Sequence, residues 1–296
     1  MISNAEVAEA VDSDLIASGM DDLLSGKPLE GALAMNRPIS PYRIYFTEIV
    51  NKVESRLGPP DLYAGGAAGV IVRWHHGQST LTVTQEQRVT MSLRSAASLS
   101  ASEATAFRSG VGTRPGQASS YLELPYLWRV VRRGSALEQP SVPPTSDWNQ
   151  LEQSLRCLLE LWVEQTSLLY NAGWCDEVAF DVSEQVSGDR VLGLLQSAED
   201  GLALFLHDHR ATTAGPPPND LVARGWQHRV RQFRAWIASF DPGPGTAEIA
   251  AGIIVRELRL RGAATPLSVA LTALSSNGES RLQLPGVPLK KADHPS

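Results

Sequence analysis

The chain has 296 residues, of which 43% are hydrophobic and 20% are charged, so its composition is that of a soluble globular protein with one large or two medium domains. The formal net charge of −6 argues against a dedicated nucleic-acid binder, because phosphate contacts need a basic surface. The first residues lack the regions of a signal peptide, and no apolar run approaches the roughly 18 residues of a membrane span. We therefore expect a cytoplasmic protein that enters no membrane.

Residues 1–38 are predicted to form a helical N-terminal segment. Val7, Val11 and Leu15 give a weak helical stripe, which Ser18-Gly19-Met20 interrupts. Ser25-Gly26-Lys27-Pro28 then ends any helix. We expect part of this segment to be mobile or to pack on a partner.

Residues 39–134 are predicted to form a first α/β unit. Its helix runs from Tyr42 to Leu57, with Ile49 and Val53 on the apolar face and Gly58 as the residue that ends it. Alternation of apolar and polar residues predicts strands, joined by short hairpin links, at 69–74, 80–84 and 88–94. A second helix is expected over 100–107, ending near Gly110.

Residues 146–289 are predicted to form a second α/β region after a proline-rich linker. Its strongest helix runs from Trp148 to Ala172. Strands are expected at 177–183, 190–195 and 201–207, and another helix at 219–240. Residues 247–261 fit a helix or a strand. Two further strands, at 266–274 and 280–284, flank the turn Asn277-Gly278, and the tail from Pro288 is expected to fray.

The order of one helix followed by three strands begins near Tyr42, Trp148 and Asn219. This leaves open whether the chain contains two or three such units, or no true repeat. In every case the pattern predicts the α+β class, with antiparallel sheets and helices packed on one face.

An aromatic and basic cluster, residues 121–133, is the candidate partner-binding segment. Aromatic residues and arginine are enriched at the centres of protein interfaces. The candidate residues are Tyr126, Trp128, Arg129, Arg132 and Arg133. The alternative is that Trp128 belongs to the core.

The candidate metal ligands are His207 and His209. Residues two apart in a strand point the same way, so both rings can reach one ion, but no third ligand is placed by spacing. The acidic residues around the strand at 177–183 are expected to form a solvated face: Asp176, Glu177, Asp181 and Glu184. The arginines of the helix at 219–240, among them Arg224, are expected on its wet side. No nucleophile elbow, phosphate loop, dinucleotide fingerprint or His-Glu-x-x-His motif occurs, so we predict no metal, no cofactor and no catalytic residue.

The span from Ile49 to Leu93 resembles small α/β domains of the immunity-protein type. The resemblance is carried by Leu57-Gly58-Pro59-Pro60, then Trp74-x-x-Gly77, then Leu81-x-Val83 and Val89-x-Met91-x-Leu93. Such domains accompany polymorphic toxins in bacteria, and their layout is shared with lipoprotein-assembly and β-lactamase-inhibitor domains. The resemblance implies a cytoplasmic protein that binds another protein and has no catalytic residues.

Three functions follow as hypotheses. The first is a non-catalytic protein-binding module, such as an immunity protein or a secretion chaperone, whose partner is a toxin or a secreted substrate. The second is an enzyme or small-molecule binder with a pocket between sheet and helices, in which His207, His209 and Asp176 act. The third is an accessory subunit of a larger assembly. The missing catalytic motifs favour the first over an enzyme.

Overall fold

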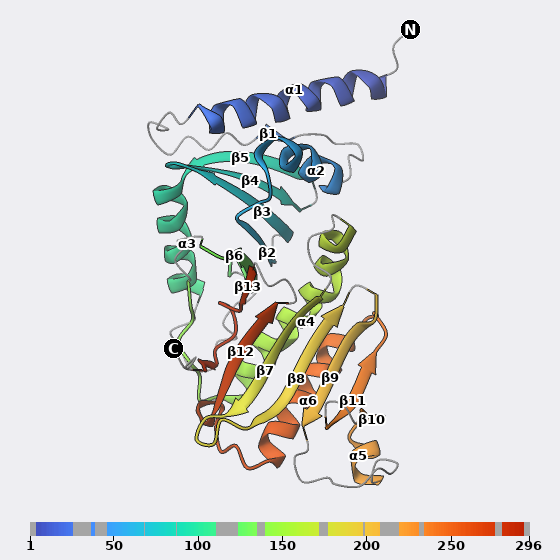
Figure 1. Cartoon of the computed structure of the whole chain (residues 1–296). Coiled ribbons are helices and arrows are strands. Elements are labelled where there is room, and N and C mark those ends of the chain that lie inside the picture. The colour runs from blue at the N-terminus through green and yellow to red at the C-terminus, as the bar shows by residue number, and fades with distance from the viewer. Residues whose placement is uncertain are drawn as a thin grey trace.

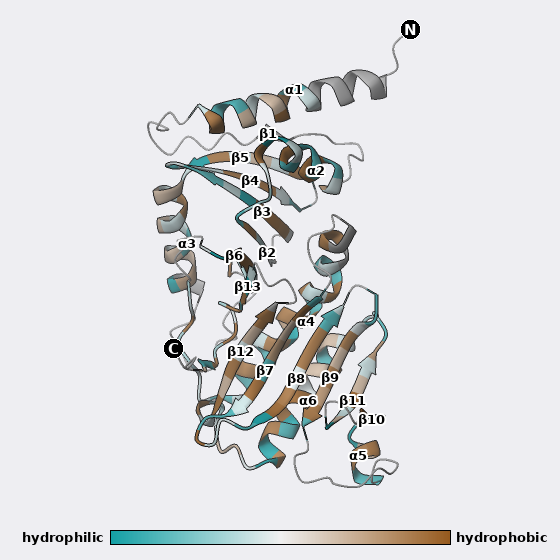
Figure 2. Cartoon of the chain, viewed as in Figure 1, coloured by the Kyte–Doolittle hydropathy of each residue, from teal (hydrophilic) through white to brown (hydrophobic). Residues whose placement is uncertain are grey.

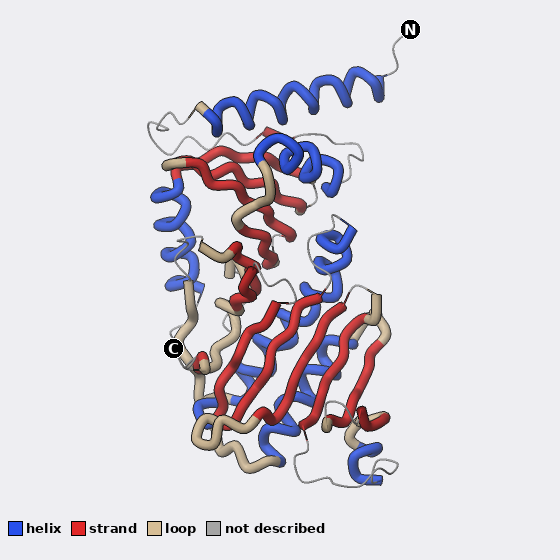
Figure 3. Tube along the Cα trace, viewed as in Figure 1, coloured by secondary structure: helices blue, strands red, loops and turns tan. Residues whose placement is uncertain are grey.

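Two mostly antiparallel sheets, each with seven described strands, form the framework of the protein in the computed structural model (Figure 1). The structure describes residues 4–25, 37–38, 46–67, 69–86, 88–110, 124–134, 140–171, 177–197, 199–207, 219–230, 234–275 and 280–292. Helices lie against both sheets, which confirms the α+β class (Figure 3).

The first sheet has the strand order β1-β5-β4-β3-β2-β6-β13, and all neighbours are antiparallel. Its strands are β1 (Arg37–Pro38), β2 (Leu62–Gly66), β3 (Gly69–His76), β4 (Ser79–Gln85), β5 (Val89–Ser95), β6 (Trp128–Arg132) and β13 (Ser280–Gln283). The strands predicted at 69–74, 80–84 and 88–94 are confirmed as β3, β4 and β5. The alternation that predicted them buries Val72, Val83 and Met91 on one face.

The second sheet has the strand order β10-β11-β9-β8-β7-β12-β14. Its strands are β7 (Glu177–Glu184), β8 (Arg190–Ser197), β9 (Gly201–His207), β10 (His228–Val230), β11 (Ala235–Phe240), β12 (Val269–Ser275) and β14 (Lys290–Lys291). The strands predicted at 177–183, 190–195 and 201–207 are confirmed. Only the β12/β14 pair is parallel among the described strands.

The helices are α1 (Asn4–Leu24), α2 (Phe46–Leu57), α3 (Ala96–Gly110), α4 (Trp148–Asn171), α5 (Asn219–Ala223) and α6 (Thr246–Leu260). The sequence signal that ends α2 acts as predicted, since Gly58 follows the helix with a φ of 80°. At the start of α4, the Asp147 carboxylate accepts the backbone N–H of Asn149 at 2.8 Å. The predicted break in the N-terminal helix is wrong. Gly19 lies inside α1, where an added Cβ would come 2.6 Å from the Cε of Met91.

The chain is built from two copies of one topology. The first copy runs in the order α2, β2, β3, β4, β5, α3 and β6. The corresponding elements of the second copy are α4, β7, β8, β9, β11, α6 and β12. The sheet neighbours also correspond, since β5-β4-β3-β2-β6 matches β11-β9-β8-β7-β12. The two copies differ in one respect, because α6 packs beside α4 whereas α3 and α2 contact opposite faces of the first sheet.

The predicted helix at 219–240, and with it a third unit starting near Asn219, is wrong. Helix α5 ends at Ala223, and Gly225 follows with a φ of 100°. Ala235 to Phe240 instead pair with β9 as strand β11. The residues Trp236 and Ala238 fit a strand as well as a helix, and the sheet decides between them by providing an edge.

The last strands also depart from the prediction. β12 and β13 are not paired with each other, since β13 joins β6 in the first sheet and β12 joins β7 in the second. Residues 276–279, with the predicted turn, lie outside the described residues. The tail from Pro288 does not fray at once: Leu289 is buried and β14 pairs with β12. Residues 247–261 are the helix α6.

Helix α4 links the two sheets through one continuous core (Figure 1). Trp162 lies 6.0 Å from Phe180 of the second sheet, measured between ring centroids, while Gln165 contacts Trp128 of the first. The apolar stripe along α4, which predicted the helix, therefore lies on a helix that contacts both sheets.

Candidate functional site

The candidate partner-binding residues separate into buried and exposed groups. Tyr126, Trp128 and Arg129 are buried, whereas Arg132 and Arg133 are exposed. Trp128 donates from Nε1 to Oε1 of Gln165 at 2.9 Å, on the face of the first sheet that α4 covers. In this conformation three of the five candidates thus belong to the interior, where Trp128 has the core role that was the alternative.

Tyr126 and Arg129 belong to a buried polar cluster that the sequence did not reveal. The Arg73 Nη1 lies 2.5 Å from Oε1 of Glu103, and the Tyr126 hydroxyl donates to the same oxygen at 2.8 Å. The Arg129 Nη2 lies 3.8 Å from the other Glu103 oxygen. We call Arg73, Glu103, Tyr126 and Arg129 the arginine cluster. Arg73 also donates to the Tyr126 hydroxyl.

The Tyr126 ring lies close to both guanidinium groups of the arginine cluster. The Cζ atoms of Arg73 and Arg129 are 5.0 Å and 5.3 Å from the ring centroid, within the range of cation–π contacts. Burial raises the pKa of Tyr126 and lowers the pKa of Arg129, although Glu103 opposes the change at Arg129. Tyr126 therefore stays neutral at physiological pH.

Of the two candidate metal ligands, His207 ends β9 and His209 lies outside the described residues, as does Asp176. Gly193 of β8 brings His207 near Asp181. A Cβ on Gly193 would lie 2.9 Å from Asp181 Oδ1 and 3.5 Å from His207 Nε2, so the glycine leaves the space in which the two side chains approach. In the described part of the chain no three side chains of metal-binding type gather.

The prediction that Asp181 lies on a solvated acidic face is wrong. Its side chain is buried and its Oδ2 pairs with Arg190 Nη2 at 3.0 Å. Burial raises the pKa of Asp181, and the charge of Arg190 partly offsets the rise. The side chains of this strand alternate between its two faces as predicted, but the face on which Asp181 lies is largely apolar.

This face of the second sheet, opposite α4 and α6, carries no described helix (Figure 1). The strand registers place on it a set of mostly apolar residues, with Thr272 and Ser239 beside them, which we call the open face: Ala179, Asp181, Gly193, Leu195, Ala203, Phe205, Ile237 and Leu274. Leu274 is 39% exposed, Leu195 and Phe205 are half-buried, and Asp181 and Ile237 are buried. Strands β8 and β9 are therefore largely apolar on both faces. Figure 2 colours most of their length as hydrophobic.

The ends of the open face are acidic. Glu177, Glu199 and Asp200 lie at the end where β8 turns into β9, and Glu184 and Asp189 at the other end, where β7 turns into β8. Arg190 stands beside Asp189 and pairs with Asp181. The described residues thus place acidic side chains, with Arg190 among them, at both ends of an apolar centre.

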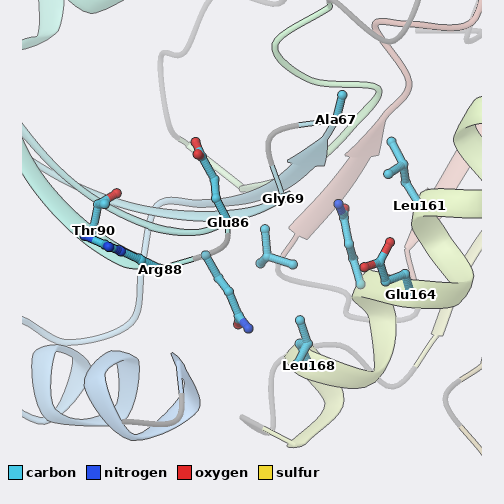
Figure 4. A pocket seen from close by; sticks show the side chains of 11 residues that line it. Ala67, Gly69, Glu86, Arg88, Thr90, Leu161, Glu164 and Leu168 are labelled. Atoms are coloured by element: carbon cyan, nitrogen blue, oxygen red, sulfur yellow. The ribbon is translucent and has the colours of Figure 1, made fainter. Parts of the chain in front are cut away.

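A pocket of about 670 Å³ lies between the first sheet and α4 (Figure 4). Leu161, Glu164 and Leu168 of α4 form one wall, and the loop residues Glu86 and Arg88 stand opposite. Ala67, Gly69, Val70, Gln85, Thr90 and Gln165 complete the lining. The pocket is therefore lined by both apolar and charged side chains.

Glycines shape the side of this pocket formed by the β2–β3 turn. A side chain on Gly65 would overlap the Gln165 Oε1 and Trp128 Nε1 atoms, and one on Gly69, whose φ is 111°, would overlap the Gln85 carbonyl. Gln165 uses both ends of its amide, since Nε2 donates to the Gly66 carbonyl at 3.0 Å. The adjacent glycines Gly65-Gly66 are the sequence feature that indicates this close approach of α4 to β2.

Comparisons with protein families, with curated proteins and with solved structures find no match to this chain. Within the described ranges, no helix has the length and apolar character needed to cross a membrane. The function is therefore argued from the geometry of the chain.

Proposed function

We propose that the protein is a non-catalytic protein-binding module, and that its partner docks on the open face of the second sheet. The observation that carries the proposal is the apolar character of β8 and β9 on both faces, when described helices cover only one. Antiparallel strands with one solvated face normally alternate apolar and polar residues. An apolar patch with a polar rim is typical of a protein interaction site.

The acidic residues at the two ends of the open face form its rim, and they favour a basic partner. Glu177, Glu199 and Asp200 at one end, and Glu184 and Asp189 at the other, favour a partner with an apolar segment flanked by basic residues. Such a role fits a cytoplasmic immunity protein or secretion chaperone, in line with the resemblance of residues 49–93, and it fits an accessory subunit equally.

The test is co-expression of the chain with the products of adjacent genes, followed by measurement of the mass of any complex in solution. Phe205→Asp and Leu195→Asp place a charge at the centre of the open face and are expected to weaken the complex by about tenfold or more. Salt is expected to weaken the wild-type complex, since the rim contributes charge attraction.

The matched control is Ile249→Asp on α6. Ile249 is 58% exposed and lies away from the open face, so this variant is expected to bind like the wild type. Leu274→Cys gives a second readout, in a chain whose Cys157 and Cys175 are replaced: a maleimide is expected to label the free protein and not the complex. A complex in which Leu274→Cys stays reactive, or a homodimer through this face, contradicts the proposal.

The pocket between the first sheet and α4 favours a second candidate function, the binding of a small molecule. Its volume of about 670 Å³ lies in the range of ligand sites, roughly 300–1,000 Å³. Glu86, Arg88 and Glu164 are the charged lining residues, and the carboxylate of Glu86 suits a ligand with an ammonium group.

A thermal-shift screen of small amines tests this second candidate. An amine that binds is expected to raise the midpoint of unfolding, and Glu86→Gln is expected to reduce the shift. Glu160→Gln, an exposed change on α4 outside the pocket lining, is the control. A screen without any shift counts against a ligand of this class.

A further inference from the structure

A second cavity, of about 500 Å³, lies at the end of the second sheet where β7 turns into β8. Residues of that turn, of the C-terminal end of α6 and of the start of β12 line it. The turn and the segment before β12 are joined there, since the backbone N–H of Gln185 donates to the Ser268 carbonyl at 3.0 Å. Figure 1 shows these segments at the lower ends of β7 and β12. The volume lies in the range of ligand sites, roughly 300–1,000 Å³.

Apolar side chains line this cavity and surround its opening. Val191 and Val269 are lining residues that belong to the core, and Leu260, also in the lining, is 60% exposed. Val186 and Leu267, the neighbours in sequence of the two hydrogen-bonded residues, are 93% and 36% exposed. An aliphatic chain that enters the cavity removes some of this apolar surface from water, which favours binding.

The two carboxylates of the cavity are available to a ligand. Asp189 makes no side-chain hydrogen bond or ion pair within the described part of the chain. Glu184 accepts a hydrogen bond from the Ser187 hydroxyl at 2.8 Å and has no ion pair among the same residues. Both acidic side chains are exposed, so a cation reaches them without displacing a basic partner.

The two arginines of the cavity are held by other groups. Arg190 Nη2 lies 3.0 Å from Asp181 Oδ2, and Arg261 Nη2 donates to the His207 carbonyl at 2.6 Å. A cation therefore meets uncommitted acidic groups, whereas an anion has to compete with contacts that the fold already makes. Because both arginines also line the cavity, an anionic ligand is the alternative that the experiment must exclude.

We propose that this cavity binds an ammonium or guanidinium group at the end of an aliphatic chain, the chemistry of lysine and arginine side chains. The chain packs against Val191 and Leu260, and Asp189 and Glu184 accept hydrogen bonds from the cation. The group can belong to a free small molecule or to a basic residue of a protein partner, since the cavity adjoins the rim of the open face. The cavity is formed by its own residues, so the proposal does not depend on docking at the open face.

The first experiment uses three probes with the same aliphatic chain: pentylamine, pentanoate and pentanol. The unfolding midpoint of the full chain is measured with each probe at matched ionic strength and neutral pH, with sodium chloride as the baseline. Pentylamine is expected to raise the midpoint above the values in pentanol and pentanoate. A midpoint in pentylamine that does not exceed the one in pentanol, or an equal rise with pentanoate, overturns the proposal.

Variants locate the bound amine. Asp189→Asn and Glu184→Gln are each expected to weaken pentylamine binding, followed by titration calorimetry, by about two- to fivefold. Asp200→Asn, an exposed change at the other end of the open face, is the matched control and is expected to leave it unchanged. Glu86→Gln reports on the pocket between the first sheet and α4. Binding that Glu86→Gln weakens and Asp189→Asn does not belongs to that pocket and overturns the proposal.

A complex with a protein partner separates the two sources of the cation. If the partner supplies it, pentylamine competes with the partner, and Asp189→Asn weakens the complex more than Asp200→Asn does. If the natural ligand is a free small molecule, the partner binds equally with and without pentylamine. Either result supports the site, provided that the amine binds the free protein. A chain that binds a partner at the open face but no amine sinks this inference alone.

Discussion

Trp128 and Gln165 meet where the two copies of the topology join. The indole Nε1 of Trp128 in β6 donates to Oε1 of Gln165 in α4 at 2.9 Å, and Gln165 Nε2 donates to the Gly66 carbonyl at 3.0 Å. Both side chains are buried. One amide therefore ties the first helix of the second copy to two strands of the first sheet, and Gly65 provides the space for it.

Gly65→Ala tests this junction. The added methyl group would overlap Gln165 and Trp128, and the hydrogen bond breaks or the backbone shifts. We expect the free energy of unfolding to fall by about 3 kcal/mol, measured by urea denaturation. Gly252→Ala in α6 is the control, since its Cβ meets only the Glu152 carboxylate at 3.7 Å, and it is expected to stabilise by about 0.5–1 kcal/mol. Equal effects of the two substitutions contradict the argument.

Glu257 holds the loop after α5 to α6. Its buried carboxylate accepts from Arg224 Nη1 at 2.5 Å and from Trp226 Nε1 at 3.1 Å. Glu257→Leu leaves the Trp226 N–H unpaired in the core, so we expect a loss of about 3 kcal/mol in calorimetric unfolding. Glu248→Gln, at an exposed position of the same helix, is expected to change stability by less than about 0.5 kcal/mol.

Asp181 is expected to give stability that increases as the pH falls. Because burial raises its pKa in the folded state, the folded protein binds this proton more tightly than the unfolded chain does. The contribution is complete below the unfolded pKa of about 3.9 and is lost as the pH rises through the folded value. Urea unfolding of the wild type and Asp181→Asn at several pH values is expected to show this dependence as a difference between them. Parallel curves contradict it.

Asp61 is expected to have the opposite effect, a contribution to stability that is lost as the pH falls. Burial alone would raise its pKa, but the His75 side chain and backbone N–H, the latter at 2.7 Å from Asp61 Oδ2, outweigh burial and lower it. The stabilisation is therefore present above pH 4 or so and is lost as the pH falls through the folded pKa. Asp61→Asn is expected to lose stability at neutral pH and to converge with the wild type in acid. A constant difference across the range sinks this prediction.

Cys157 is expected to react slowly with thiol reagents in the folded protein. It is buried in α4, and burial raises the pKa of its thiol, which lowers the fraction of reactive thiolate. In a Cys175→Ser variant, labelling is expected to accelerate as urea unfolds the chain. Fast labelling without urea would show that α4 opens locally.

The sequence by itself determines most of the secondary structure of the chain. Leu81 and Val83 between threonines specify a strand, and the stripe that contains Leu155 and Trp162 specifies a helix, because each pattern places apolar groups on one side of a short segment. These signals predicted the α+β class and most elements of both copies. These patterns involve residues within about four positions of one another, so they predict helices and strands without knowledge of the fold.

Only the tertiary structure decided which segments meet. The sequence pattern of residues 235–240 fits both a helix and a strand, and the free edge of β9 makes it a strand. Ser280–Gln283 crosses to the first sheet because β6 offers an edge there. Arg73, Glu103 and Arg129 are far apart in the chain, so no spacing predicted the arginine cluster. Burial of Asp181 likewise depends on a glycine in the next strand, which means that charge, exposure and binding surfaces follow from contacts between distant segments.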